Sequence, residues 1–225
     1  MDFGESMLQG QETELSAALE AWYPAHARTL PWRRDQDPYR IWVSEIMLQQ
    51  TRVEAVIPYY ERFMSVLPTV QALAQVPEEI LLKLWEGLGY YSRARNLQKA
   101  AQQICQDYGG KLPKDYESLR TLAGIGDYTA GAVASIAFGQ RVPAVDGNVL
   151  RVLSRVAACG ADISNGKVKQ QFRRAAQRLM DSCQDPAILT QALMELGATV
   201  CLPNRAPLCD RCPVKEYCQS CAQAT

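Results

Sequence analysis

Residues 122–130 read Leu-Ala-Gly-Ile-Gly-Asp-Tyr-Thr-Ala and place a Gly-Ile-Gly turn between two stretches with helical patterning. Glycine lets the backbone turn tightly and approach a partner closely. The amides that open the following helix form a ready site for an anion such as one phosphate. The same spacing also fits an ordinary connection between two helices that ends in a glycine cap, so the turn alone leaves both interpretations open. Asp127 suits a helix N-terminus, although it would repel a bound phosphate.

Helical patterning extends from this turn over nearly the whole chain. Apolar residues recur with a period of 3.6, and no Asn-Gly or Asp-Gly hairpin lies between alternating apolar runs. The chain is therefore predicted to be all-α, with Pro58 breaking or kinking the longest helix. The expected helices cover 11–23, 39–66, 69–75, 78–86, 92–108, 116–122, 128–138, 148–158, 167–181 and 186–200.

Composition and charge narrow the class of protein. The 225 residues are 48% hydrophobic and 21% charged, which is typical of a globular protein that buries a core without disulfide bonds. The 24 Lys and Arg balance 24 Asp and Glu, which excludes a generally basic nucleic-acid coat. Residues 141–178 are locally basic, which suits either a solvated helix face or a face for phosphates.

Targeting and membrane signals are not recognised in the sequence. No apolar stretch approaches the roughly 20 residues of a membrane span. Residues 1–10 contain the acids Asp2 and Glu5 but no basic residue, unlike a secretory or transit signal. We therefore expect a cytoplasmic protein that has no membrane partner.

Five cysteines lie within the last 25 residues, and such crowding in a cytoplasmic chain indicates a metal site. The pattern is Cys201-x7-Cys209-x2-Cys212-x5-Cys218, with Cys221 three residues beyond. Four thiolates can hold zinc or a [4Fe-4S] cluster, and spacing alone does not separate the two.

Asp146 is the first of two carboxylates with potential chemistry. It lies in Val145-Asp146-Gly147-Asn148-Val149, which opens an amphipathic helix. A residue of this type in this place is first of all an N-cap that accepts amide hydrogen bonds. A carboxylate fixed in that way could also stabilise a cationic sugar transition state or attack its anomeric carbon, and the two roles are compatible.

Glu45 is the second, on a helical stripe shared with Ile41 and Leu48. A carboxyl on an apolar face loses solvation, which favours its protonated form and suits a general acid. The alternative is a glutamate at the edge of the face that reaches water or pairs with Arg40 or Arg52.

Taken in order, these stretches resemble the MutY-type adenine DNA glycosylases of the endonuclease III, or helix-hairpin-helix, superfamily. The likeness runs from about Trp22 to Cys218. It is carried by Leu30-Pro31-Trp32-Arg33, by Ser44-Glu45-Ile46-Met47-Leu48-Gln49-Gln50-Thr51, by residues 86–97 (EGLGYYSRARNL), by residues 145–149, by the Gly-Ile-Gly turn and by the cysteines. Two departures are that the first cysteine gap holds seven residues where the family usually has six, and that Cys221 is a spare thiol.

The resemblance implies an all-α, two-lobed fold. One lobe is a six-helix barrel with the helix-hairpin-helix over residues 28–138, and the other is an iron-sulfur cluster domain made of residues 1–27 and 139–225. Cys201, Cys209, Cys212 and Cys218 would bind the [4Fe-4S] cluster.

The resemblance also implies a chemistry. Glu45 matches the acid that protonates a flipped adenine, and Asp146 matches the carboxylate that stabilises or briefly captures the oxocarbenium sugar. Asn148 and Tyr128 match positions that line the same pocket. Bifunctional relatives have a lysine where Tyr128 stands, and a phenol cannot form a Schiff base, so a monofunctional glycosylase with little lyase activity is expected.

The implied partner is double-stranded DNA with adenine opposite 8-oxoguanine or guanine, bound by a monomer associated with the bacterial nucleoid. Gln50 matches the intercalating residue, and the other matched lesion contacts are Leu48, Gln49, Thr51 and Tyr90. Amides around Gly124 and Gly126 and bases such as Arg93, Arg95 and Arg151 would contact phosphates. Family members usually continue into a Nudix-like C-terminal domain that helps to read 8-oxoguanine. Whether fragment or short member, a chain ending at Thr225 is expected to excise adenine with weaker discrimination between opposite 8-oxoguanine and guanine.

Two other functions remain open from the sequence. Short members of the superfamily remove thymine from T:G mismatches, and some carry tyrosine at the position of Tyr128, although Glu45 with Gln49 and Gln50 favours adenine. An endonuclease III-like lyase is disfavoured by Tyr128. From a different class, the chain could be a non-catalytic DNA-binding module with structural zinc, in which Glu45 is a core-edge residue and Asp146 only a cap.

Overall fold

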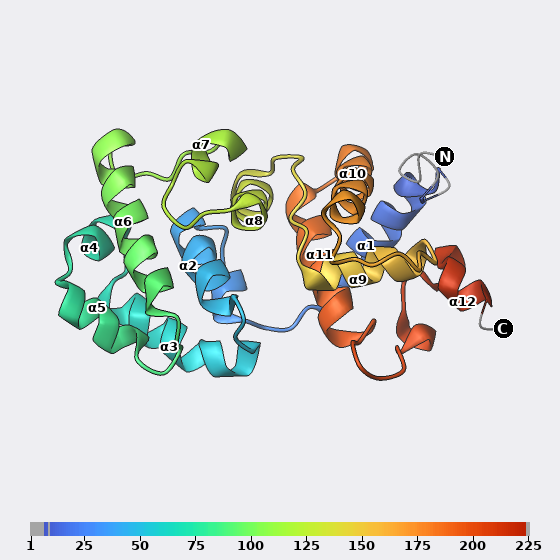
Figure 1. Cartoon of the computed structure of the whole chain (residues 1–225), viewed down its shortest axis with the longest axis horizontal. Coiled ribbons are helices and arrows are strands. Elements are labelled where there is room, and N and C mark those ends of the chain that lie inside the picture. The colour runs from blue at the N-terminus through green and yellow to red at the C-terminus, as the bar shows by residue number, and fades with distance from the viewer. Residues whose placement is uncertain (1–6, 9, 224–225) are drawn as a thin grey trace. The chain divides into compact units, whose positions relative to one another are not determined.

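The computed structural model describes residues 7–8 and 10–223. The chain divides into two compact units, one being Thr29–Phe138 and the other Met1–Arg28 with Gly139–Thr225. The described residues form helices and contain no strand, so the predicted all-α class is confirmed (Figure 1). None of the described helices combines the length and apolar character needed to cross a bilayer.

The unit Thr29–Phe138 is built around helix α8 (Asp127–Phe138), which packs against α2 (Pro38–Leu48). Every residue of α8 from Thr129 to Ile136 is buried, as expected for a helix that is apolar on all sides. The other elements of this unit are η1 (Pro31–Arg33), α3 (Val53–Val66), α4 (Val70–Gln75), α5 (Glu78–Trp85), α6 (Tyr91–Asp107) and α7 (Tyr116–Arg120).

The start of α2 shows how local sequence places this central pair. The Asp37 side chain accepts hydrogen bonds from the amides of Tyr39 and Arg40, and Pro38 occupies the first turn. An acidic N-cap followed by proline is a strong helix start. Trp42, one turn further on, is fully buried in the core.

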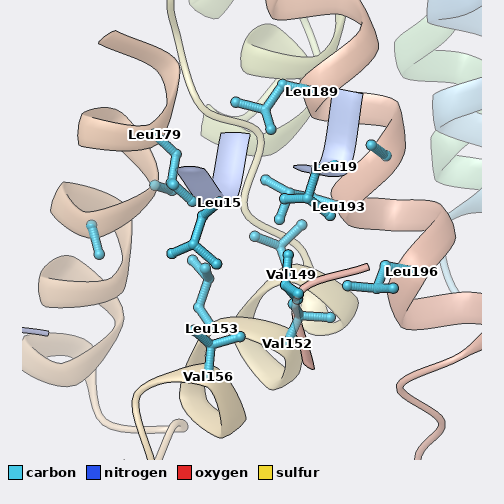
Figure 2. Close-up of a cluster of buried hydrophobic side chains, with 14 of the residues drawn as sticks. Leu15, Leu19, Val149, Val152, Leu153, Val156, Leu179, Leu189, Leu193 and Leu196 are labelled. Atoms are coloured by element: carbon cyan, nitrogen blue, oxygen red, sulfur yellow. The ribbon is translucent and has the colours of Figure 1, made fainter. Parts of the chain in front are cut away.

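The other unit joins the beginning of the chain to its end. Helix α1 (Glu12–His26) packs against α10 (Gly166–Ser182) and α11 (Pro186–Thr199), and α9 (Gly147–Val156) packs against α11. Leu15 and Leu19 of α1 lie among Leu179, Leu193 and Val149 in the core of this unit (Figure 2). The chain then continues through η2 (Cys209–Arg211), η3 (Lys215–Tyr217) and α12 (Gln219–Gln223).

Two helix boundaries differ from expectation. The helix expected over 39–66 is interrupted at 49–52 rather than at Pro58, which lies inside α3. Gln49 leaves helical geometry and Gln50 takes a left-handed φ of 58°, which ends α2. The helix expected over 11–23 continues through Pro24 and ends at His26.

Candidate active site

Glu45 lies on α2 and is buried, with only 6% of the residue exposed. The Tyr128 hydroxyl, at the start of α8, donates a hydrogen bond to Glu45 Oε2 over 2.6 Å. The pairing of α2 with α8 therefore brings together two residues that are far apart in sequence. The burial of Glu45 also excludes the alternative in which this residue lies at the edge of the helix face and reaches water.

Asp146 caps α9. One carboxylate oxygen, Oδ1, accepts from the Val149 amide at 2.8 Å, and the other accepts from Asn148 Nδ2 at 2.7 Å. Both oxygens are thus oriented by the first turn of the helix. The capping role is observed, and it fixes a carboxylate in a defined direction, as a role in catalysis would require.

Arg151, expected from sequence to contact phosphate, has its guanidinium bonded within the chain and extends this arrangement. Its Nη2 donates to Asn148 Oδ1 at 2.9 Å and to the Gly197 carbonyl at 2.8 Å, and its Nε donates to the Cys201 carbonyl at 3.0 Å. Burial lowers the pKa of Arg151 from its ordinary value. The spacing of Asn148 and Arg151 on one helix, three residues apart, is the sequence feature that could have indicated the pair.

The turn of residues 122–126 joins α7 to α8 as a helical hairpin. Gly124 has a φ of 73°, and a Cβ there would lie 2.8 Å from the Cβ of Asn96, so this position requires glycine. Asp127 pairs with Arg120 Nε at 2.6 Å and accepts from the Tyr116 hydroxyl at 3.0 Å. The first helix of the hairpin therefore offsets the negative charge beside the amides that open α8.

The loop after α2 carries the residues expected around a lesion. Leu48, Gln49 and Thr51 are half-buried and Gln50 is exposed. Gln49 lines a small cavity of about 60 Å³ together with Asn96 and Gly124. Tyr90, 65% exposed, shares with Gln50 a left-handed backbone that is unusual for a residue with a side chain. Such backbone outliers concentrate at functional sites.

Arg93, expected to contact phosphate, instead donates to backbone carbonyls. Its Nη1 bonds the carbonyls of Ile46 at 2.8 Å and Gln49 at 2.6 Å, and its Nη2 bonds that of Leu88 at 3.0 Å. Burial lowers its pKa. The residue ties the end of α2 to the turn before α6. Arg95 stays at the surface, where it forms an ion pair with Glu78.

The C-terminal cysteines line one cavity of about 150 Å³ in the second unit. The thiols are those of Cys201, Cys209, Cys212, Cys218 and Cys221. All described cysteines are free of disulfide bonds. Burial raises the pKa of the Cys212 thiol to about 11 and also raises the pKa of Cys209 and of Cys218. In the described residues, no three Cys, His, Asp or Glu side chains form a site for one metal ion.

Comparisons with known proteins identify the class to which this fold and these residues belong. Residues 43–178 match the model of the HhH-GPD superfamily of base excision DNA repair proteins, and the chain belongs to this family. The match spans Glu45, the hairpin, Tyr128 and Asp146.

Named relatives are similar to this chain over nearly its whole length. It is 50% identical to the human adenine DNA glycosylase over 217 residues, covering 92% of this chain and 39% of that protein. It is 40% identical to an adenine DNA glycosylase of the bacterium Buchnera aphidicola over 200 residues, covering 88% of this chain and 56% of that protein. The chain thus spans between about two fifths and just over half of the length of these relatives.

Solved structures share the fold. A thermostable thymine-DNA glycosylase superposes with a TM-score of 0.81 at 25% identity, covering 95% of this chain and 97% of that one. An endonuclease III in a non-covalent DNA complex superposes with a TM-score of 0.73 at 24% identity, with the same coverage.

Proposed function

We propose that this chain is the glycosylase part of an adenine DNA glycosylase, which hydrolyses the N-glycosidic bond of adenine mispaired with 8-oxoguanine or guanine in duplex DNA. The observation that carries the proposal is the buried carboxyl of Glu45, held by Tyr128 at 2.6 Å, in a chain 50% identical to a named adenine glycosylase. The other residues supply a fixed carboxylate at Asp146 and a helical hairpin.

The reaction would begin with adenine flipped out of the base stack, since the sugar bond is out of reach inside a duplex. Glu45 donates a proton to the base, so that adenine leaves as a neutral molecule when the bond from its nitrogen to the anomeric carbon breaks. The Tyr128 hydroxyl then stabilises the Glu45 carboxylate by the hydrogen bond described above. A carboxylate accepts such a hydrogen bond more strongly than the protonated, neutral carboxyl group does.

Asp146 would stabilise the positive charge that develops on the sugar as the base leaves. Water adds to the anomeric carbon and gives up a proton to the solvent, from which the Glu45 carboxylate regains the proton that it lost, and the products are an abasic site and free adenine. Because Tyr128 offers a phenol and no amine, the chain forms no Schiff base and does not cut the strand.

For DNA binding, we propose that Gln50 enters the stack, with Leu48, Gln49, Thr51 and Tyr90 around the lesion. The amides at Gly124 and Gly126 would hold one phosphate, as helix N-termini do for anions. The left-handed backbones of Gln50 and Tyr90 support this assignment, because such conformations need support from the surrounding structure.

The cysteines fit a [4Fe-4S] cluster as the resident cofactor. A single zinc ion needs its sulfurs at about 2.3 Å from one point, whereas a cluster presents four separate iron corners to its ligands. Thiols spread around a cavity of about 150 Å³ suit the second case. We propose that Cys201, Cys209, Cys212 and Cys218 hold it, and that the bound cluster ties the C-terminal segment into its unit.

The test is single-turnover cleavage of labelled duplexes with A opposite 8-oxoguanine, A opposite G and T opposite G, with and without alkali. Breaks at adenine that require alkali are expected. Glu45→Gln should lower the rate by about 10²- to 10⁴-fold, the usual contribution of a general acid. The exposed Glu61→Gln on α3 is the matched control and should match the parent. A Glu45→Gln protein that folds and excises adenine at the parent rate would contradict the assignment.

Thymine opposite guanine is the second candidate substrate, favoured by the likeness to the thymine-DNA glycosylase structure. Breaks only in the T:G duplex would move the assignment to that activity. Strand breaks without alkali would overturn the monofunctional assignment.

A further inference from the structure

Asp127 lies in the helical hairpin at a position where its charge opposes DNA binding. It opens α8 directly after Gly126, and both residues are exposed. A Cβ on Gly126 would meet no atom within 4 Å, so this face of the turn is open to a ligand. A carboxylate beside amides that are proposed to hold a phosphate would repel that phosphate. The partners of this carboxylate therefore decide how the hairpin meets DNA.

The carboxylate of Asp127 holds an arginine from the other helix of the hairpin. Its Oδ1 contacts Arg120 Nε at 2.6 Å and accepts from the Tyr116 hydroxyl at 3.0 Å. Tyr116 and Arg120 begin and end α7, four residues apart, so they share one face of this short helix. The Arg120 guanidinium also lies over the Tyr116 ring, 5.6 Å from its centroid, where a cation is attracted. Two neighbours thus fix the direction of Arg120.

Arg120 keeps donors for a further partner. Its side chain is 45% exposed, and its third contact, from Nη1 to Glu117, is long at 3.5 Å and reaches a carboxylate that is 79% exposed. In the part of the chain that the structure describes, no residue accepts a hydrogen bond from Nη2 of Arg120. An exposed ion pair contributes about 0–1 kcal/mol, so the fold gains little from holding this side chain. A guanidinium that is already ordered loses less entropy when it binds an anion.

Phosphate is the anion that suits this position. A guanidinium presents a planar fork of donors that matches phosphate oxygens. Arg120 belongs to the same hairpin as the amides of Gly124 and Gly126, and the phosphates of a DNA strand follow one another closely. We propose that Arg120 binds a DNA phosphate next to the one held by these amides, and that Asp127 is a positioning residue for its guanidinium. The inference rests on the proposed function.

The salt dependence of DNA binding by the full chain tests the contact. The probe is an undamaged duplex, and its affinity is measured over a range of salt concentrations. Arg120→Gln should weaken binding and reduce the slope of log K against log salt concentration by about 0.9, the value for one phosphate of duplex DNA. Circular dichroism shows whether each protein is folded.

Arg40→Gln is the matched control, because Arg40 forms a 2.6 Å contact with Asp35 and its side chain is 43% exposed. Its affinity and slope should match those of the parent. An unchanged slope in folded Arg120→Gln would overturn the phosphate contact and leave the proposed glycosylase intact. A parent that binds no duplex and excises no adenine would overturn the proposed function, and the inference with it.

Asp127→Ala, made in the parent and in Arg120→Gln, tests the positioning role. Removal of the carboxylate ends its repulsion of phosphate in both proteins, which tightens binding. In the parent, the same change also releases the Arg120 guanidinium, which offsets part of the tightening. We therefore expect a larger increase in affinity in the Arg120→Gln protein than in the parent.

Equal increases in the two proteins would show that the two residues act independently. A larger increase in the parent would show that Asp127 withholds Arg120 from DNA. Either result would overturn the positioning role of Asp127.

Discussion

At the scale of single residues, the hydrogen bond from Tyr128 to Glu45 can be separated from simple packing. Tyr128→Phe keeps the ring and removes the donor at 2.6 Å from Oε2. A hydrogen bond to a charged group contributes about 1.5–3 kcal/mol, so the single-turnover rate should fall by about 10- to 100-fold. Without the donor, the carboxyl keeps its proton to higher pH. The alkaline limb of the pH–rate profile should therefore move upward.

Tyr60→Phe is the matched control for that change. The buried Tyr60 hydroxyl has no hydrogen-bond partner in the described part of the chain, so its removal should alter neither rate nor pH profile. A lowered rate for Tyr128→Phe with an unmoved alkaline limb would assign Tyr128 to packing rather than to the acid.

A second residue-scale prediction concerns Gly197 on α11, at the contact of this helix with the start of α9. A Cβ at Gly197 would lie 2.6 Å from the Asn148 Cβ and 3.2 Å from its Cα, so Gly197→Ala must displace the start of α9. Overpacking of this kind costs about 1–3 kcal/mol. Because Asn148 orients Asp146, we expect excision to slow in protein that is still folded at the assay temperature.

Gly166→Ala on α10 is the control for Gly197, since a Cβ there meets no atom within 4 Å. Denaturant unfolding and single-turnover rates measure the two effects. Destabilisation of Gly197→Ala with an unchanged rate would show that Asn148 does not transmit the displacement to the active site.

At the scale of elements, the loop between α2 and α3 depends on Arg93. The Arg93 guanidinium donates hydrogen bonds to carbonyls at the end of α2, which a helix leaves without partners. It also donates to the Leu88 carbonyl in the turn before Tyr90. Lysine cannot form the same planar fork. Arg93→Lys should therefore speed hydrogen exchange at residues 46–51 and 88–90 and weaken binding of mispaired DNA.

Arg62→Lys is the comparison, because Arg62 makes a single 3.3 Å bond to the Leu84 carbonyl from an exposed position. Its exchange and binding should stay close to the parent. Unchanged protection around Gln50 in Arg93→Lys would mean that packing alone holds the loop.

The same loop shows where sequence reasoning succeeds and where it ends. The helical periodicity around Glu45 placed it on a stripe with Ile41 and Leu48 but left burial and an edge position both open, and its burial against α8 was seen only in the structure. Asp146 was recognisable as an N-cap because capping is a local property. The interruption of the helix at 49–52 could not be predicted, because this segment contains no glycine or proline. It is supported instead by hydrogen bonds from Arg93, which lies more than forty residues later in the sequence. Arg93 was read as a phosphate contact for the same reason, because charge is visible in sequence and its partners are not.

At the scale of the whole molecule, the N-terminal helix must be held to helices that come more than a hundred residues later. Arg28, just after α1, binds Glu195 of α11 through Nε at 2.7 Å and Nη2 at 3.0 Å. The Glu195 side chain is fully buried. Removal of the guanidinium takes this charged partner away from a fully buried carboxylate, and breaking a buried ion pair costs about 3–5 kcal/mol. We therefore expect Arg28→Ala to unfold at markedly lower denaturant concentration than the parent.

The surface pair of Arg40 with Asp35 provides the contrast that makes this prediction specific. Its 2.6 Å contact is as short, yet both side chains are more than two fifths exposed. Exposed pairs contribute about 0–1 kcal/mol, because water and salt screen them. Arg40→Ala should thus shift the unfolding midpoint little. Equal shifts of the unfolding midpoint for the two variants would show that the buried ion pair does not hold α1 to α11. The apolar contacts around Leu15 and Leu19 would then be sufficient to hold α1 in its unit.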